Sequence, residues 1–409
     1  MIKSPIFLAT VSILLSGCGV TSVKYGDVRH EILSTGDRCN PAVTSGSAVA
    51  GKPYFLVTSR LPDCRNSQIA MTTQRSLAVR YARFATPSMG RDDSGKKALL
   101  VDLAFQPADD WWGSLAREAR VNDGRVLLYV HGYRETFAGA ARDTAQIARL
   151  TEFAGPVIHY SWPSQARLLK YVADETNMYW AQRHFQVLLE RLAKLEGVTE
   201  IVVVSHSLGA RLVIPALEYV DRNSKSADSS NISNIILASP DVDREDFERD
   251  IAEEILAARR VNNDRRITIY LSANDKALGI SRTLHGYPRL GSPRCFNPFE
   301  AAELKRQGFP VRCYATKTKY DVAPSKSGLA IVDTTEVTKG GSGHSDFLQS
   351  SAACRDFAAV VGGAREPING RLATRLSHVF TLAPPAKGEK PDNDAICKRT
   401  NFTAKAALP

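Results

Sequence analysis

The chain of 409 residues lacks any apolar run near the roughly 20 residues that a spanning helix needs, which excludes a multi-span membrane protein. It also lacks the excess of charge over apolar residues that keeps chains unfolded, since 44% of its residues are hydrophobic and 23% are charged. Its seven cysteines are too few for a small disulfide scaffold. These absences leave a globular protein with one large domain or two of ordinary size.

Motifs for metal and nucleotide binding are missing as well. The sequence has no Cys-x-x-Cys pair and no His-Glu-x-x-His segment, so it predicts no metal site. The glycine-rich run at residues 340–343 is not followed by Gly-Lys-Ser/Thr, so it is not read as a phosphate loop. The net charge of +10 is spread along the chain, and its densest basic stretch, at residues 259–266, is short. We therefore expect no cofactor and no nucleic-acid partner.

The first eighteen residues are typical of an export signal. Lys3 precedes an apolar run at residues 6–15, which is too short to span a bilayer and matches a signal-peptide core. Leu-Ser-Gly-Cys at residues 15–18 resembles the lipobox of bacterial lipoproteins, in which the peptide is cut before the cysteine. That resemblance implies a signal peptide over residues 1–17 and acylation of Cys18, and Gly19 favours the periplasmic face of the outer membrane. An ordinary secretory signal is the alternative.

Acylation of Cys18 leaves six cysteines, an even number that predicts disulfides in an exported chain. Six unpaired buried thiols, as in a cytosolic enzyme, are the alternative. Pairing by sequence neighbours is the simplest of the possible connectivities: Cys39 with Cys64, Cys295 with Cys313, and Cys354 with Cys397.

Short apolar segments alternate with helical patterns between about residues 50 and 380, which is typical of parallel strands covered by helices. Helices are predicted over residues 137–150 and 178–196, and a third helix follows Ser207 with Pro215 expected to kink it. The predicted strands are residues 54–58, 98–105, 126–130, 157–161, 201–204, 234–238, 267–272 and 330–333. We expect an α/β domain over residues 51–381, between a tether at residues 18–50 and a tail at residues 382–409.

The main chemical signal lies at the end of the fifth of these strands. An apolar strand runs into Ser-His-Ser-Leu-Gly at residues 205–209 and then directly into a helix. This resembles the G-x-S-x-G nucleophile elbow, with Ser205 in place of the first glycine. The tight turn needs small residues on both sides, and it exposes the Ser207 hydroxyl at a helix N-terminus that favours negative charge. A plain strand–helix turn is the alternative for this pattern alone.

The strand at residues 125–130 ends in His131, Gly132 and Tyr133. In α/β-hydrolases this loop supplies one amide of the oxyanion hole, which here would be that of Tyr133. The residue after the nucleophile, Leu208, would supply the second amide. We expect His131 itself to be structural.

The triad acid is sought at the ends of the later strands. Asp275 follows the strand at residues 267–272, which is the seventh when the His-Gly strand is counted as the third, the usual position of the acid. Asp241 and Asp243, after the preceding strand, remain alternatives because some lipases place the acid there. Asp275 is preferred.

The triad base must follow the acid in the chain. His344 lies in a glycine-rich loop after the strand at residues 330–333, just before a helix, and is the predicted base. His285 follows Asp275 too closely to leave room for another strand, and His378 lies in an apolar stretch that suggests a packed residue.

With these residues in place, residues 54–360 resemble a bacterial α/β-hydrolase family usually labelled "esterase/lipase superfamily enzyme". The shared segments are Thr-Ser-Arg at 58–60, the His-Gly-Tyr loop, Ser-Trp-Pro-Ser at 161–164, Ala-Ser-Pro-Asp-Val-Asp-Arg at 238–244 and Ser-Ala-Asn-Asp-Lys-Ala-Leu at 272–278. The resemblance implies an α/β-hydrolase fold with a triad of Ser207, Asp275 and His344. Leu208 stands where family members usually have methionine.

These features predict a carboxylesterase that acts through an acyl-enzyme on a small-molecule or lipid acyl substrate. The segment between Trp162 and Met178 is the expected lid, whereas Trp162, Tyr179 and Trp180 are expected in the core. The alternative from another class is a non-catalytic envelope lipoprotein that uses the hydrolase fold as a binding scaffold.

Overall fold

A computed structural model describes residues 37–44, 49, 53–66, 68–92, 94–223, 231–252, 265–315, 328–337, 342–348 and 350–384. The predicted signal peptide, the acylation site Cys18 and the cysteine Cys397 lie outside these residues. Across the described ranges, no helix combines the length and the apolar character of a membrane span.

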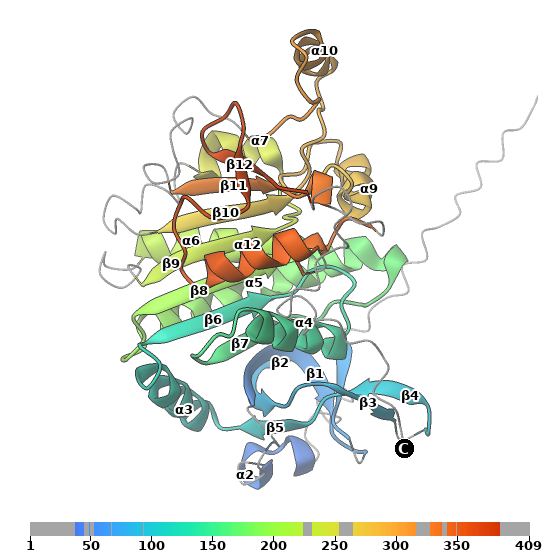
Figure 1. Ribbon diagram of the computed structural model, residues 1–409. Coiled ribbons are helices and arrows are strands. Elements are labelled where there is room, and N and C mark those ends of the chain that lie inside the picture. Colours follow the sequence, from blue (N-terminus) through green and yellow to red (C-terminus); the bar gives the residue numbers. More distant parts are fainter. Residues whose placement is uncertain are drawn as a thin grey trace, which may run out of the picture.

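One eleven-stranded sheet organises the described chain, in the order β12-β13-β11-β10-β9-β8-β6-β7-β1-β2-β5 (Figure 1). The strands from β1 to β13 in this order run parallel to their neighbours, and β2, β5 and β12 pair antiparallel at the two edges. The predicted α/β class and mostly parallel sheet are confirmed. The bounds are β1 Tyr54–Asp63, β2 Ala70–Phe84, β5 Leu103–Gln106, β6 Arg125–Val130, β7 Val157–Ser161, β8 Glu200–His206, β9 Ile232–Ala238, β10 Arg266–Leu271, β11 Leu329–Asp333, β12 Arg371–Ala373 and β13 Val379–Leu382.

Helices cover both faces of the sheet (Figure 1). Helices α3 (Ala108–Arg120), α5 (Tyr171–Ala193) and α6 (Ala210–Asn223) pack on one face, and α4 (Phe137–Leu150) and α12 (Ser351–Val361) pack on the other. Each face of the sheet has a hydrophobic core, the first under α3, α5 and α6 and the second under α4 and α12. Strand β8 is apolar throughout because it is buried on both faces: Val203 packs in the first core, and Val202 and Val204 pack in the second. The remaining helices are α2 (Pro41–Thr44), α7 (Arg244–Asp246), α9 (Lys276–His285) and α10 (Pro298–Arg306).

The predicted helix over residues 137–150 is confirmed as α4, whose N-cap Thr136 accepts a bond from the Gly139 amide at 2.9 Å. Helix α5 begins at Tyr171, seven residues before the predicted start. Its first turns bury the polar Asp174 and Asn177, so the apolar spacing that predicts a helix is interrupted there. Helix α6 runs through Pro215 as one element.

One predicted strand needs correction, and one long strand of the sheet was not predicted. The predicted strand at residues 98–105 is two elements: β4 (Lys97–Leu100), which pairs with β3 (Ser88–Arg91), and β5 of the main sheet. Strand β2 was not predicted, because many of its side chains are polar and only partly buried, and the strand pairs at its antiparallel edge.

Two of the predicted disulfides are present. Cys39 is bonded to Cys64 after β1, with 5.6 Å between their Cα atoms. Cys295 is bonded to Cys313, with Cα atoms 4.9 Å apart. The third predicted pair, Cys354 with Cys397, stays a prediction.

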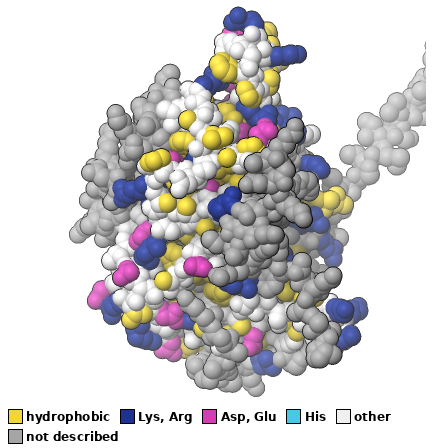
Figure 2. Space-filling model, viewed as in Figure 1, with side chains coloured by type: hydrophobic (Ala, Val, Ile, Leu, Met, Phe, Trp, Pro, Cys, Tyr) yellow, Lys and Arg dark blue, Asp and Glu magenta, His cyan; other side chains and the backbone are white. Residues whose placement is uncertain are grey.

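The second disulfide closes the base of an arm that carries α10 and projects from the body of the molecule (Figure 1). Figure 2 shows hydrophobic and basic side chains next to each other on this arm, where Phe299, Lys305 and Arg306 are exposed.

The two cores predict a contrast between matched leucine substitutions. Leu128 lies in β6 and is fully buried in the first core, whereas Leu77 in β2 is 74% exposed. We expect Leu128→Ala to lower the free energy of unfolding by about 2–5 kcal/mol and Leu77→Ala by less than about 0.5 kcal/mol. Urea unfolding followed by circular dichroism measures both, and equal losses would contradict the assignment of β6 to the core.

Candidate active site

Ser207 lies at a sharp turn between β8 and α6. Strand β8 ends at His206, and the short helix η3 (Ser207–Gly209) begins at Ser207 itself. Its φ angle is +52°, a left-handed conformation that costs energy for any residue other than glycine. Gly209 must be small, because a Cβ there would lie 2.6 Å from the His131 carbonyl oxygen. The turn has the predicted geometry of a nucleophile elbow.

The loop after β6 lies directly against this serine. A Cβ placed on Gly132 would be 2.8 Å from the Cβ of Ser207, so the His-Gly-Tyr segment fits there only with glycine at its centre. This contact puts Tyr133 and Leu208, the two predicted oxyanion-hole residues, on the loops that border Ser207.

His131 has a structural role beneath that loop, as expected. Its ring stacks on Trp162 at 4.9 Å between centroids, and the Trp162 indole N–H donates to the His131 carbonyl at 2.9 Å. Burial, the Arg60 charge and His159 hold the pKa of His131 well below its usual value, so the ring is neutral. Trp162 is fully buried and belongs to the core, whereas Tyr179, also expected there, is exposed and Trp180 is only partly buried.

Asp275 and His344 are in direct contact across two loops. The Nδ1 atom of His344 lies 2.7 Å from Oδ2 of Asp275, whose other oxygen accepts the Leu278 amide at 2.9 Å and so caps α9. The two loops are fastened by a bond from the Lys276 amide to the Ser342 carbonyl at 2.9 Å. Gly343, with φ +70°, packs against the backbone of the Asp275 loop where no side chain would fit.

The electrostatic setting favours the protonated form of His344. Burial lowers its pKa, but the Asp275 carboxylate, with more distant contributions from Asp241 and Glu135, raises the pKa above its usual value overall. His206 packs beside it, with 4.7 Å between ring centroids, and its Nε2 lies 3.0 Å from the His344 carbonyl oxygen. Burial and the neighbouring His344 lower the pKa of His206 to about 3, so His206 is a neutral support that sequence reasoning missed.

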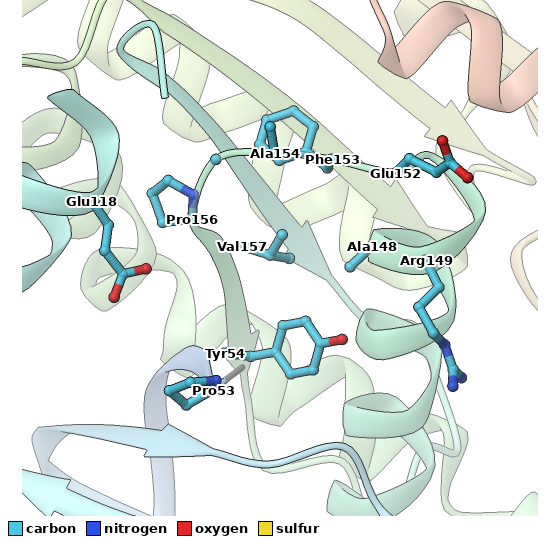
Figure 3. Close-up of a pocket in the computed structure, with 11 residues that line it drawn as sticks. Pro53, Tyr54, Glu118, Ala148, Arg149, Glu152, Phe153, Ala154, Pro156 and Val157 are labelled. Carbon is cyan, nitrogen blue, oxygen red and sulfur yellow. The ribbon is translucent and has the colours of Figure 1, made fainter. Parts of the chain in front are cut away.

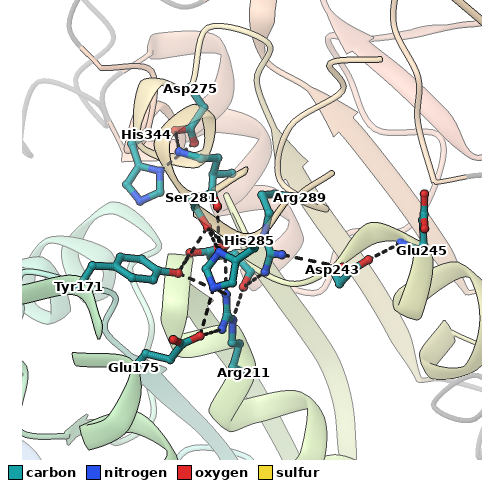
Figure 4. A network of polar contacts seen from close by, with 12 residues as sticks. Tyr171, Glu175, Arg211, Asp243, Glu245, Asp275, Ser281, His285, Arg289 and His344 are labelled. Carbon is teal, nitrogen blue, oxygen red and sulfur yellow. Dashed lines mark hydrogen bonds and ion pairs between the residues drawn. The ribbon is translucent and has the colours of Figure 1, made fainter. Parts of the chain in front are cut away.

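The alternative acids make other contacts (Figure 4). Asp241 is buried and accepts from Arg289 Nε at 2.8 Å, Ser281 Oγ at 2.6 Å and Tyr171 Oη at 2.6 Å. Asp243 caps the short helix α7 by accepting the Glu245 amide at 2.8 Å. Of the three aspartates, Asp275 is the one bonded to His344.

The alternative histidines make other contacts. The Nε2 atom of His285, at the end of α9, is 3.2 Å from Oε1 of Glu175. His378 is buried, with its Nε2 atom 3.2 Å from the Ala315 carbonyl oxygen. In the ranges that the structure describes, no three His, Cys, Asp or Glu side chains gather as metal ligands.

A buried arginine, which the sequence reasoning named only as part of a motif, holds the loops around this site. The Arg60 guanidinium donates to Ser161 Oγ at 3.0 Å, to the Ser164 carbonyl at 3.1 Å and to the Glu135 carbonyl at 3.0 Å. Desolvation lowers its pKa to about 10, while the nearby Asp174 and Glu135 carboxylates act in the opposite direction. Arg60 therefore stays charged at neutral pH and fixes the loops after β6 and β7 to β1.

The predicted lid segment lies over the loop that carries Tyr133. The Tyr133 hydroxyl donates to the Leu168 carbonyl, and its ring meets the Tyr171 ring edge-on with centroids 5.1 Å apart. Asp174, one turn into α5, accepts from Ser164 Oγ at 2.6 Å and from the Arg134 amide at 3.1 Å. The segment is thus bonded to the site loops on both sides.

Residues 113–355 match the family described as "Alpha/beta hydrolase of unknown function (DUF900)". The chain belongs to this family. The match includes the elbow, the Asp275 loop and the His344 loop within one hydrolase domain.

Two solved structures are similar to this hydrolase at low identity. A predicted CIB-like hydrolase from Thermoplasma acidophilum is 13% identical, with 68% of this chain and 97% of that chain covered and a TM-score of 0.29. ESTFA in its Fe-lacking apo form is 11% identical, with 83% and 95% covered and a TM-score of 0.31. No curated protein matches the chain.

The hydrolase also has a cavity of about 550 Å³ away from the candidate catalytic residues (Figure 3). Tyr54, Pro156 and Val157 line it at the starts of β1 and β7, with Glu118 and Arg149 on its sides. Because the candidate catalytic residues follow the ends of parallel strands, this cavity lies at the opposite edge of the sheet and is not part of the candidate site.

The Asp275–His344 contact makes a prediction that does not depend on activity. Replacing the carboxylate in Asp275→Asn removes the charge that favours the imidazolium, so the pKa of His344 should fall. Titration of the histidine ring signals by NMR measures the change, with Asp243→Asn as the matched control. An unchanged His344 titration in Asp275→Asn would contradict the pairing.

Proposed function

We propose that this hydrolase is a serine carboxylesterase in which Ser207 is the nucleophile, His344 the general base and Asp275 the orienting acid. The observation that carries the proposal is the 2.7 Å contact of His344 Nδ1 with Asp275, beside a serine held at φ +52° between a strand and a helix. With Nδ1 bonded to the carboxylate, Nε2 is the ring nitrogen left to accept the Ser207 proton.

In the proposed reaction, Ser207 Oγ attacks the acyl carbonyl as His344 removes its proton, and the carbonyl oxygen becomes an oxyanion. The amides of Tyr133 and Leu208 would hold that oxyanion, each contributing about 10²- to 10³-fold in rate. His344 then protonates the leaving alcohol, and a water molecule, deprotonated in turn by His344, releases the acid and frees Ser207. Asp275 stabilises the imidazolium in both steps.

The rim of the site supports an ester with an apolar acyl group. Leu168, Leu169 and Val172 are all exposed on the segment that covers Tyr133, and Leu169 is 95% exposed. On α9, whose Ser281 lies near Tyr171, Ile280 and Leu284 are also exposed. Apolar side chains on both elements would contact an acyl chain, because burial there removes apolar surface from water.

The lipid anchor at Cys18 and a position on the periplasmic face of the outer membrane are part of the same proposal. Two disulfides in the described chain support an oxidising compartment, where such bonds persist.

The first test is labelling with a fluorophosphonate, which reacts covalently with activated serines. The wild-type protein should be labelled and Ser207→Ala should lose all labelling, because the probe needs the hydroxyl oxygen as nucleophile. Ser114→Ala in α3 is the matched control and should label as the wild type does. Folded wild-type protein that takes up no probe would contradict the proposed esterase activity and favour a non-catalytic binding scaffold.

The second test compares p-nitrophenyl esters of increasing acyl length. We expect kcat/KM to rise from acetate to medium chains, by a factor of up to about four per buried methylene, which corresponds to about 0.8 kcal/mol. Leu169→Ser should reduce this slope, and the exposed Leu77→Ser should leave it unchanged. A flat profile in the wild type would count against the apolar rim as the acyl contact.

A further inference from the structure

A polar cluster that includes Arg211, Ser281 and Arg289 lies beside the Asp275–His344 pair (Figure 4). Asp241, on the loop after β9, accepts bonds from Arg289 Nε at 2.8 Å, Ser281 Oγ at 2.6 Å and Tyr171 Oη at 2.6 Å. Arg211 Nη2 lies 3.4 Å from the same carboxylate. Both oxygens are therefore occupied by donors from α5, α6, α9 and the loop after α9.

The cluster pairs buried charges of both signs. Arg211 pairs with Glu175 as well as with Asp241, and Arg289 pairs with Asp241 and, at 3.9 Å, with Asp243. Two guanidinium groups thus face three carboxylates, in a region where Arg289 and Asp241 are almost completely buried. Loss of one charge would leave an unpaired guanidinium in a poorly solvated place, which is costly.

The same aspartate is bonded to the nucleophile's backbone. The Asp241 amide donates to the Ser207 carbonyl at 3.1 Å. In return Arg211, in the first turn of α6 after the elbow, donates from Nε to the Asp241 carbonyl at 2.6 Å. Ser207 holds a strained left-handed conformation, and such a conformation persists only where its surroundings fix it.

Asp241 is also bonded to the beginning of α5, which lies over the loop that carries Tyr133. Tyr171, which donates to its carboxylate, packs edge-on against Tyr133. Glu175, one turn further along α5, is bonded through Arg211. The turn at Ser207 and the beginning of α5 over Tyr133 therefore meet at one residue: Asp241 contacts the turn through its backbone and α5 through its carboxylate.

We propose that Asp241 is a positioning residue: it fixes the Ser207 turn and the start of α5 relative to each other, so that the hydroxyl and the oxyanion loop keep one spacing. The inference rests on the esterase proposed above. It assigns Asp241 no contact with substrate, and a rate loss would arise from misplacement of Ser207 against Tyr133 and Leu208.

Asp241→Asn separates this role from simple packing. Asparagine keeps the shape and the backbone N–H to Ser207, but its amide group presents donors to Tyr171, Ser281 or an arginine, which are donors themselves. It also removes one of the negative charges that act on His344. The charged and titratable groups around that imidazole are Asp275 and Glu135, which with Asp241 favour its protonation, and His206, which opposes it.

The experiment measures the fluorophosphonate labelling rate and the pH profile of ester hydrolysis for wild type, Asp241→Asn, Tyr171→Phe and the exposed control Asp110→Asn. We expect Asp241→Asn to react about 10- to 100-fold more slowly, since a displacement near 1 Å is enough for such a loss. Its acidic limb should move to lower pH, because removing an anion lowers the pKa of His344. Tyr171→Phe should lose rate in the same direction with an unmoved acidic limb, and Asp110→Asn, at an exposed position of α3, should stay within about twofold of wild type.

Thermal unfolding shows which variants are folded. Folded Asp241→Asn that reacts at the wild-type rate with an unmoved acidic limb overturns the proposal. If Asp241→Asn does not fold, Tyr171→Phe decides, and a wild-type rate there overturns it as well. A wild-type protein that takes up no probe overturns the esterase itself and the positioning role with it, whereas a labelled wild type with unaffected variants overturns only the positioning role.

Discussion

The Arg60 guanidinium is fully buried at the middle of β1 and donates to the loops that follow β6 and β7. A buried charge is tolerated only when hydrogen bonds and opposite charge replace its water, and here three backbone carbonyls, a serine hydroxyl and the nearby Asp174 provide this. Moving the Arg60 guanidinium would break its buried hydrogen bonds at a large cost in free energy. Arg60 therefore holds the loop that borders Ser207 in place. The geometry of the site depends on this polar contact within the fold more than on apolar packing.

Two polar networks meet at the beginning of α5. Asp174 receives bonds from the loops after β6 and β7, while Tyr171 and Glu175 join the cluster around Asp241. The segment that the sequence predicts as a lid is thus bonded on one side to the loop that carries Tyr133 and on the other to the cluster around Asp241. Its leucines, Leu168 and Leu169, are exposed.

The catalytic candidates could be located from sequence because each depends on local pattern. A buried strand followed by small residues around Ser207, and polar side chains at strand ends for Asp275 and His344, are visible without any tertiary information. The start of α5 was missed because Asp174 and Asn177 are buried by hydrogen bonds, which leave no apolar period. The contacts of Asp241 were likewise hidden, since its partners come from segments 30 to 70 residues away.

The arm between Cys295 and Cys313 has a consequence for how this chain can vary. The disulfide joins the two ends of the arm where they leave the body, so the arm is a closed loop. Near its second end the arm is also held to the sheet, because Arg312 pairs with Asp333 of β11. Insertions or deletions within α10 would change the size of the loop at a small entropic cost. The surface around α10 can thus be remodelled while the elements that carry the candidate catalytic residues keep their places.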